Sequence, residues 1–209
     1  MYVPKSFEAP DDAWCHALIA RESFALLVST GDDGAPFATH VPLLLDADRG
    51  TYGTLVGHVA RANPHARLLG AGAATLAVFQ GPHAYVSPGW YRVHPSVPTW
   101  NYVAVHAYGR PIVIEAPDRV RALLARLVGT YEAARSAPWR FESLAADYVD
   151  GMMRGIVAFE LPIERLEGKA KLSQNRGAED RAGAIQGLEA TGDALARATA
   201  ELMRAADGR

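Results

Sequence analysis

The stretch GHVARANPH, residues 57–65, gathers polar side chains at the end of an apolar run. Within it, His58, Arg61 and Asn63 stand where an expected strand gives way to an expected short helix. Asn63 is suited to cap that helix, and Pro64 to occupy its first turn. A helix N-terminus exposes unpaired N–H groups, and an arginine beside it adds a permanent cation with forked donors. The pattern outlines a phosphate site, although this stretch alone favours a surface arginine and an ordinary cap.

Three further stretches place polar or aromatic side chains where a plain β-barrel does not need them. In ATHVP, Thr39 and His40 interrupt an apolar strand, and in VPTWNY, Trp100 and Asn101 stand in a proline-framed loop. The stretch GKAKLSQN, residues 168–175, follows the last expected strand. A tryptophan offers a flat apolar face to an aromatic ring, although tryptophan more often fills a gap in a core.

The last of these stretches contributes a cation and two amides. Lys171 is a candidate second cation for a phosphate, with a solvated lysine as the alternative. Gln174 and Asn175 carry donors and acceptors suited to the edge of a heterocycle, with ordinary turn chemistry as the alternative. Each stretch is weak evidence by itself. Together they describe a ligand with a phosphate, a polar-edged ring and a flat face, and flavin mononucleotide (FMN) fits that description.

The elements that must position these residues are short strands joined by turns. Six strands are expected from apolar and β-branched runs, at 23–30, 35–46, 51–59, 73–81, 101–115 and from 154 onward. The tetrad GDDG, residues 31–34, predicts a hairpin between the first two. Helices are expected at 64–70, 118–135, within 141–149, and at 178–206, where leucines share one seam. The pattern predicts a small β-barrel with peripheral helices.

Length and composition limit the classes of protein to consider. The 209 residues, 49% of them apolar, suit one globular domain. We place this domain at 1–177. A C-terminal helix is expected at 178–209, where it packs on the barrel or on a dimer partner. Net charge is -2, which gives no support for nucleic-acid binding. Cys15 is the single cysteine, so no internal disulfide forms, and we expect a buried apolar side chain there. No metal site and no catalytic residue is assigned.

Targeting segments are not evident in the sequence. The opening residues lack the apolar segment of a signal peptide, and no run reaches the ~18 apolar residues of a membrane span. We therefore expect a cytoplasmic protein that does not enter a membrane. The sequence also lacks dinucleotide, P-loop, zinc-protease and nucleophile-elbow motifs.

The chain resembles the PaiB-like proteins, which are also called FMN-binding negative transcriptional regulators. The resemblance is carried by MYVPKSF, THVPLLL, GHVARANPH, YVSPGWY, VPTWNY and KLSQN in this order, and it runs from residue 1 to about 206. It implies a six-stranded antiparallel split β-barrel (α+β), related to pyridoxamine-phosphate oxidases and flavin reductases. It also implies a homodimer with two FMN sites at the subunit interface and a role as a repressor.

The resemblance further implies which residues surround the isoalloxazine ring of FMN. Thr39, His40 and Val41 would line the ring through side chain and backbone. Trp100 would approach the ring from the partner subunit.

The remaining implied contacts concern the ribityl phosphate and the closure of the site. His58, Arg61 and Asn63 would meet the phosphate or its surroundings. Lys171 and Gln174 would close the site.

The sequence leaves two main functions open, a regulator and an enzyme, and a third possibility beside them. A regulator that contacts DNA needs a concentrated basic face, and the candidates are Arg119, Arg121, Arg126 and Arg135, diluted by neighbouring acids. The alternative is an FMN-dependent oxidoreductase of the flavin-reductase or pyridoxamine-oxidase type, for which no general base is obligatory. A third possibility is a barrel that binds no flavin, or binds haem with His40 or His58 as the axial ligand.

Overall fold

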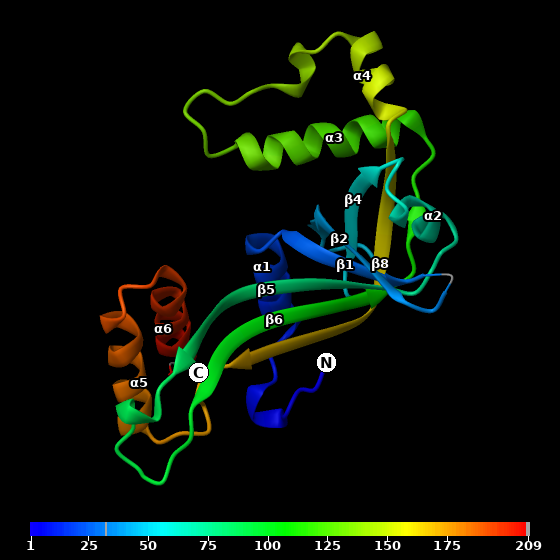
Figure 1. Ribbon diagram of the computed structural model, residues 1–209. Helices are drawn as coiled ribbons and strands as arrows, with labels where there is room; N and C mark the ends of the chain where they lie inside the picture. Colours follow the sequence, from blue (N-terminus) through cyan, green and yellow to red (C-terminus); the bar gives the residue numbers. More distant parts are fainter. Residues whose placement is uncertain (32, 208–209) are drawn as a thin grey trace. The chain divides into compact units, whose positions relative to one another are not determined.

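The computed structural model describes residues 1–31 and 33–207 (Figure 1). These residues form two compact units, each assembled from several segments of the chain. Unit 1 comprises Met1–Leu18, Phe79–His106 and Glu167–Arg209, and unit 2 comprises Ile19–Val78 and Ala107–Leu166. Three long strands contribute residues to both units: β5 (Thr75–Val86), β6 (Thr99–Gly109) and β8 (Ile156–Lys171).

The described strands belong to one sheet of eight, with the order β2-β1-β5-β6-β8-β4-β3 and with β7 beside β8. The shorter strands are β1 (Phe24–Thr30), β2 (Pro36–Pro42), β3 (Leu44–Asp46), β4 (Thr54–Ala60) and β7 (Ile112–Val113). Strand β1 pairs with β2 and β5, and β4 pairs with β3 and β8, all antiparallel. This arrangement confirms the predicted antiparallel split barrel with peripheral helices.

The strand number differs from the predicted six because two predicted strands are broken. The predicted strand 35–46 divides at Leu43, whose side chain is fully buried and whose N–H donates to Ser23 O (2.9 Å). The predicted strand 101–115 divides at Arg110–Pro111, which confirms the expected kink, because proline cannot donate to a ladder. In the predicted GDDG hairpin, Asp32 lies outside the described residues, but β1 and β2 pair on either side of it.

Unit 2 buries its helix α3 (Pro117–Glu132) against one face of the sheet. The apolar side of α3 repeats at helical spacing, as the sequence predicts. Its buried residues pack with β3, β4 and β8 in one cluster that includes Leu44, Val56, Ala158, Val120, Leu123 and Leu127. The other helices of this unit are α2 (His65–Gly70) and α4 (Ala146–Met153), and a 3-10 turn η3 (Phe141–Ser143) precedes α4.

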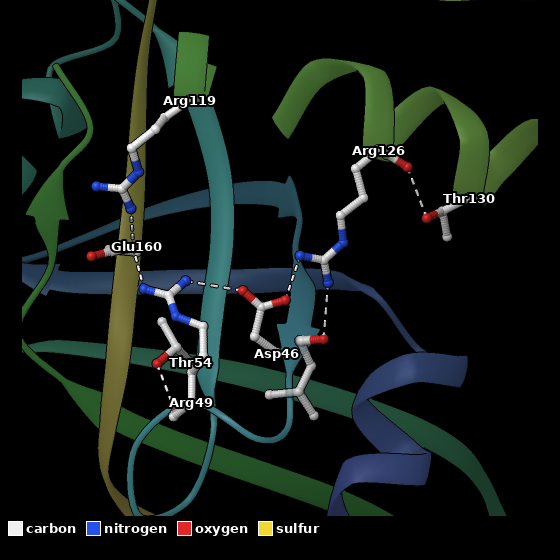
Figure 2. Close-up of polar contacts among 8 residues, drawn as sticks. Asp46, Arg49, Thr54, Arg119, Arg126, Thr130 and Glu160 are labelled. Atoms are coloured by element: carbon white, nitrogen blue, oxygen red, sulfur yellow. Dashed lines mark hydrogen bonds and ion pairs between the residues drawn. The ribbon is translucent and has the colours of Figure 1, made fainter. Parts of the chain in front are cut away.

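Ion pairs hold α3 to the sheet beside this apolar contact (Figure 2). Glu160 on β8 is buried and accepts hydrogen bonds from Arg49 (2.7 Å) and from Arg119 of α3 (2.8 Å). Asp46 on β3 accepts from Arg49 (3.0 Å) and pairs with Arg126 of α3. Two carboxylates, on strands that flank β4, therefore fix two positions, separated by nearly two turns, along the same helix.

Unit 1 carries α1 (Asp12–Arg21) as far as Leu18, the 3-10 turns η1 (Lys5–Phe7) and η2 (Pro88–Trp90), and two C-terminal helices. The prediction of one helix at 178–206 is wrong, because the chain forms α5 (Ala178–Ala190) and α6 (Ala194–Asp207). Gly192 between them adopts φ +75°, a left-handed conformation that ends α5. The predicted single leucine seam is interrupted as well: Leu188 is fully buried, while Leu195 is 45% exposed.

Candidate functional site

The nine predicted site residues are divided between the two units of the structure. Trp100, Lys171 and Gln174 belong to unit 1. Unit 2 contains the other six: Thr39, His40, Val41, His58, Arg61 and Asn63.

Strand β2 separates the three predicted isoalloxazine contacts by its alternation. Thr39 and Val41 share one face, and Val41 is buried there. His40 points to the opposite face, where its ring stacks on Phe24 with the ring centroids 5.9 Å apart. Strand β2 pairs with β1 and ends the sheet, so alternate backbone N–H and C=O groups along it face away from the ladder. The half-buried side chain of Thr39 and the backbone of β2 can thus meet a ligand, whereas the side chain of Val41 packs in the core.

Thr39 is held in a buried polar cluster that the sequence did not reveal. His65 is fully buried, and its Nδ1 lies 2.9 Å from Thr39 Oγ1 while its Nε2 lies 2.9 Å from Ser29 Oγ. Asn63 Nδ2 donates to Thr39 Oγ1 (3.3 Å), and Ser29 Oγ lies 2.6 Å from Thr75 Oγ1. His65 is the last residue of GHVARANPH, so the sequence did contain this histidine. Nothing in the pattern indicated its partners, Thr39 on β2 and Ser29 on β1.

The helix that follows Asn63 begins one residue later than predicted. Helix α2 starts at His65, and Asn63 Oδ1 accepts the N–H of His65 (2.9 Å), so Asn63 does cap the first turn with its side chain. The helix has six residues, so its dipole contributes little to an anion site. Electrostatic attraction of a phosphate in this region therefore depends on Arg61.

Arg61 is partly engaged with the backbone of its own unit. Its Nε donates to Arg154 O and its Nη2 to Ile156 O, both at 2.8 Å. Nη1 has no hydrogen-bond partner among the residues that the structure describes. Arg61 also lines a cavity of about 840 Å³, whose lining combines apolar side chains with Glu115, Asp150 and Arg154. The two carbonyl contacts fix the orientation of the guanidinium and leave its Nη1 available to a ligand.

His58 has a polar atom that the described protein leaves unsatisfied. It lies on β4 opposite Ala158, and its half-buried ring carries a buried Nδ1 with no hydrogen-bond partner in the described part of the chain. Burial lowers the pKa of His58, so the ring is neutral at pH 7. Gly57 before it is explained by packing, since a Cβ there would overlap Leu43.

Trp100 belongs to an exposed aromatic group in unit 1. Trp100 is 53% exposed and Tyr85 is 47% exposed, with their ring centroids 6.1 Å apart, and the ring of His83 lies 6.2 Å from Trp100. Lys171 Nζ donates to Trp100 O (2.8 Å) and to Thr99 Oγ1. Burial, together with a neighbouring lysine, lowers the pKa of Lys171. The tryptophan is thus not a core residue, and a cation lies against its backbone.

Gln174 is engaged in its own turn. Its Oε1 accepts the N–H of Leu172 (2.7 Å), and its Nε2 donates to Ala170 O (2.5 Å). Asn101, the polar neighbour of Trp100, is fully buried and donates to Ser173 Oγ (2.9 Å). Gln174 thus matches the alternative of ordinary turn chemistry, and its contact with a ligand stays a prediction.

The four arginines considered for a basic face each form an ion pair. These pairs are Arg119–Glu160, Arg121–Asp150, Arg126–Asp46 and Arg135–Glu132. Positive charge that is balanced within the fold gives little net attraction for a phosphate backbone.

Within residues 1–31 and 33–207, no group of three or more His, Cys, Asp or Glu side chains is arranged for a metal ion. None of the described helices is both long enough and apolar enough to span a membrane.

Comparison with known sequences places the chain in a family. Residues 1–165 match the family model described as "Putative FMN-binding domain". The chain is 36% identical to "Protease synthase and sporulation protein PAI 2" of Bacillus subtilis, over 97% of this chain and 96% of that protein. It is 32% identical to an uncharacterised protein of Aspergillus fumigatus, over 80% of this chain and 81% of that protein.

Solved structures share the fold. The FAD and heme binding protein from Mycobacterium smegmatis is similar with a TM-score of 0.61 at 19% identity, over 85% of this chain and 79% of that one. The flavocytochrome Anf3 from Azotobacter vinelandii gives a TM-score of 0.61 at 16% identity, over 87% of this chain and 78% of that one. The chain belongs to the family of FMN-binding split-barrel proteins that the matching model defines, and its cofactor is FMN.

Proposed function

We propose that this chain is a homodimeric FMN-binding protein that acts as a negative regulator of gene expression. The observation that carries the proposal is the 36% identity, across 97% of the chain, to a protein whose name links it to protease synthesis and sporulation. The six stretches shared with PaiB-like proteins support the same function, and FMN would act as a sensing or structural ligand.

The described residues of unit 2 fit one part of a flavin nucleotide. Arg61 offers a free Nη1 for the phosphate, with its guanidinium held by two backbone carbonyls. The side chain of Thr39 and the open edge of β2 offer polar groups to a ring, and Val41 would contribute its backbone. The unsatisfied Nδ1 of His58 is a further polar atom that a ligand or water can satisfy. His40, which faces the other side of β2, would contribute its backbone.

Trp100 and Lys171 would come from the second subunit. The exposed rings of Trp100 and Tyr85 support this part of the proposal, because aromatic residues are enriched at subunit interfaces. Lys171 supplies a cation beside them, and Gln174 keeps the turn that carries it. Sedimentation analysis of the purified protein with FMN should give a dimer, and a monomer at micromolar concentration would reject this assignment.

The phosphate assignment is tested by titrating FMN against Arg61→Ala and a matched control. Loss of one charge-assisted contact should weaken binding by about ten- to a hundredfold, from the ~1.5–3 kcal/mol typical of such bonds. The control is Arg110→Ala, because Arg110 also donates to a backbone carbonyl (Gly72 O, 3.1 Å) but does not line the Arg61 cavity. Thermal unfolding of both variants separates lost affinity from lost structure. Unchanged FMN affinity in a folded Arg61→Ala would show that the phosphate lies elsewhere.

The regulatory output is tested with DNA from upstream of the chain's own gene. A gel-shift titration with and without FMN should show retardation that weakens as salt rises. No retardation at low salt in either state would exclude regulation by direct DNA contact.

An FMN-dependent oxidoreductase is the second candidate, and the ion-paired arginines favour it. All four candidate arginines are ion-paired within the fold, which leaves little positive charge to attract the phosphates of DNA on α3 or at Arg135 just after it. Bound FMN would supply hydride transfer, and the protein would supply position and electrostatics. NADH or NADPH oxidation by the FMN-loaded protein, above the rate of free FMN, supports this candidate, and an equal rate rejects it.

A further inference from the structure

Five polar side chains of unit 2 form one continuous chain of hydrogen bonds through the fully buried imidazole of His65. Their order is Asn63, Thr39, His65, Ser29 and Thr75. Both ends of the chain are attached to the backbone, whose donor and acceptor roles are fixed. The direction of every hydrogen bond between them can therefore be worked out.

The donor and acceptor roles can be assigned in sequence, beginning with Thr75. Its hydroxyl donates to Ala73 O (2.8 Å), which uses its one proton. Ser29 must then donate its own proton to Thr75 Oγ1 (2.6 Å). With that proton used, Ser29 Oγ can only accept from His65 Nε2 (2.9 Å). The imidazole therefore carries a proton on Nε2.

The opposite end of the chain of hydrogen bonds fixes the donor and acceptor roles of Asn63 and Thr39. Asn63 Oδ1 accepts the backbone N–H of His65 (2.9 Å), so the amide cannot be flipped and its Nδ2 donates to Thr39 Oγ1 (3.3 Å). In the neutral Nε2–H tautomer, His65 Nδ1 has no proton, so it accepts the hydroxyl of Thr39 (2.9 Å). The single proton of Thr39 is thereby used inside the protein.

A charged imidazole would break this arrangement. An imidazolium donates from both nitrogens, so Thr39 would have to accept and its proton would be released to point elsewhere. Burial opposes that state, since it lowers the pKa of His65. The aromatic ring of Phe37 packs against the imidazole edge-on, with centroids 5.4 Å apart, and adds no charge.

We infer that His65 is a positioning residue that makes Thr39 an acceptor, and not a donor, toward a bound ligand. One lone pair of Thr39 Oγ1 remains after Asn63 is satisfied, and the side chain is half-buried, on the same face as Val41. Such an acceptor selects a ligand edge that carries an N–H. Resting on the proposed FMN site, the inference assigns this contact to N3–H, the ring N–H of oxidised isoalloxazine.

The first test reads the tautomer in the ligand-free protein. Histidine ¹⁵N and ¹³C chemical shifts at pH 7 should show His65 as a neutral Nε2–H imidazole, assigned by comparison with His65→Asn. The hydrogen bonds to Ser29 and Thr39 impose this tautomer, so the shifts test the direction of hydrogen bonding on which the acceptor role of Thr39 depends. The Nδ1–H tautomer or an imidazolium would overturn the inference, whether or not the protein binds FMN.

The second test compares FMN with FMN methylated at N3, in the parent, Thr39→Val and Thr39→Ser. The preference for FMN should be about three- to tenfold larger in the parent than in Thr39→Val, the range of one neutral hydrogen bond. Thr39→Ser should keep the parent's preference because it keeps the hydroxyl. Equal preferences in the parent and Thr39→Val would overturn the contact with N3–H. A parent that binds neither flavin would reject the proposed site and this contact together, while the tautomer result would still decide the role of His65.

Discussion

Gly187 of α5 lies against the indole ring of Trp90. A Cβ on Gly187 would overlap three atoms of that ring, and a Cβ on Gly183, one turn earlier, would overlap the carbonyl oxygen of Trp90. Glycine usually weakens a helix, and here two glycines at i, i+4 spacing let the helix approach another segment closely. The contact explains why α5 carries two glycines, which would otherwise weaken it.

Gly187→Ala should therefore destabilise the protein, although alanine is the better helix former. Overpacking typically costs about 1–3 kcal/mol, which exceeds the ~0.5–1 kcal/mol gained in helix propensity. The matched control is Gly129→Ala in α3, where a Cβ meets nothing within 4 Å. That variant should gain up to about 1 kcal/mol. Urea unfolding measures both, and a Gly187→Ala protein as stable as Gly129→Ala would disprove the close contact.

Glu160→Gln should be clearly destabilising because it weakens two hydrogen bonds from arginines at once. Glu160 is buried and accepts from Arg49 and Arg119, and bonds to charged groups are worth about 1.5–3 kcal/mol. The comparison is Asp150→Asn, which removes the exposed pair with Arg121 and should cost less than about 1 kcal/mol. Chemical denaturation at low and high salt gives both values. Equal costs for the two variants would contradict an anchoring role for Glu160.

Much of the fold was predictable because it depends on local patterns. Apolar and β-branched runs predicted β1 and β4, and helical spacing predicted α3 and its buried face. The break at Leu43 was not predictable, because it is caused by a buried side chain and a backbone bond to Ser23, both set by tertiary contacts. The division of the C-terminal helix was signalled by Gly192, but a single glycine does not show whether a helix ends or continues.

The residue types of the candidate site could be predicted from the sequence, but the hydrogen-bond partners of these residues could not. Asn63 was expected to cap, and it does, at His65. The commitment of Gln174 to its own turn follows from a local conformation that the sequence does not display. Likewise, two of the donors of Arg61 are used by carbonyls nearly a hundred residues later in the chain, a relation that no local pattern encodes.

The thiol of Cys15 should be unreactive in the folded protein. Burial, with smaller contributions from Asp12 and Asp11, raises its pKa to about 11, so little thiolate exists at pH 8. A disulfide reagent should react slowly with the native protein and at once in denaturant. Ser136→Cys combined with Cys15→Ser provides an exposed control thiol, which should react quickly when folded. Fast modification of native Cys15 would contradict its burial.

Stability should fall as pH decreases through the range just below neutrality. Burial lowers the pKa of His65 and of His58, so the unfolded chain takes up protons at these rings near pH 6.5 while the native protein does not. The unfolded state then binds more protons, and the free energy of unfolding rises with pH, by at most about 1.4 kcal/mol per pH unit for each histidine. The dependence should level off once the pH drops below the native pKa values. Urea unfolding between pH 5 and 7.5 measures the slope. The variant His58→Phe should reduce the slope and leave the contribution of His65. A flat profile in the parent would show that neither ring is protected from protonation.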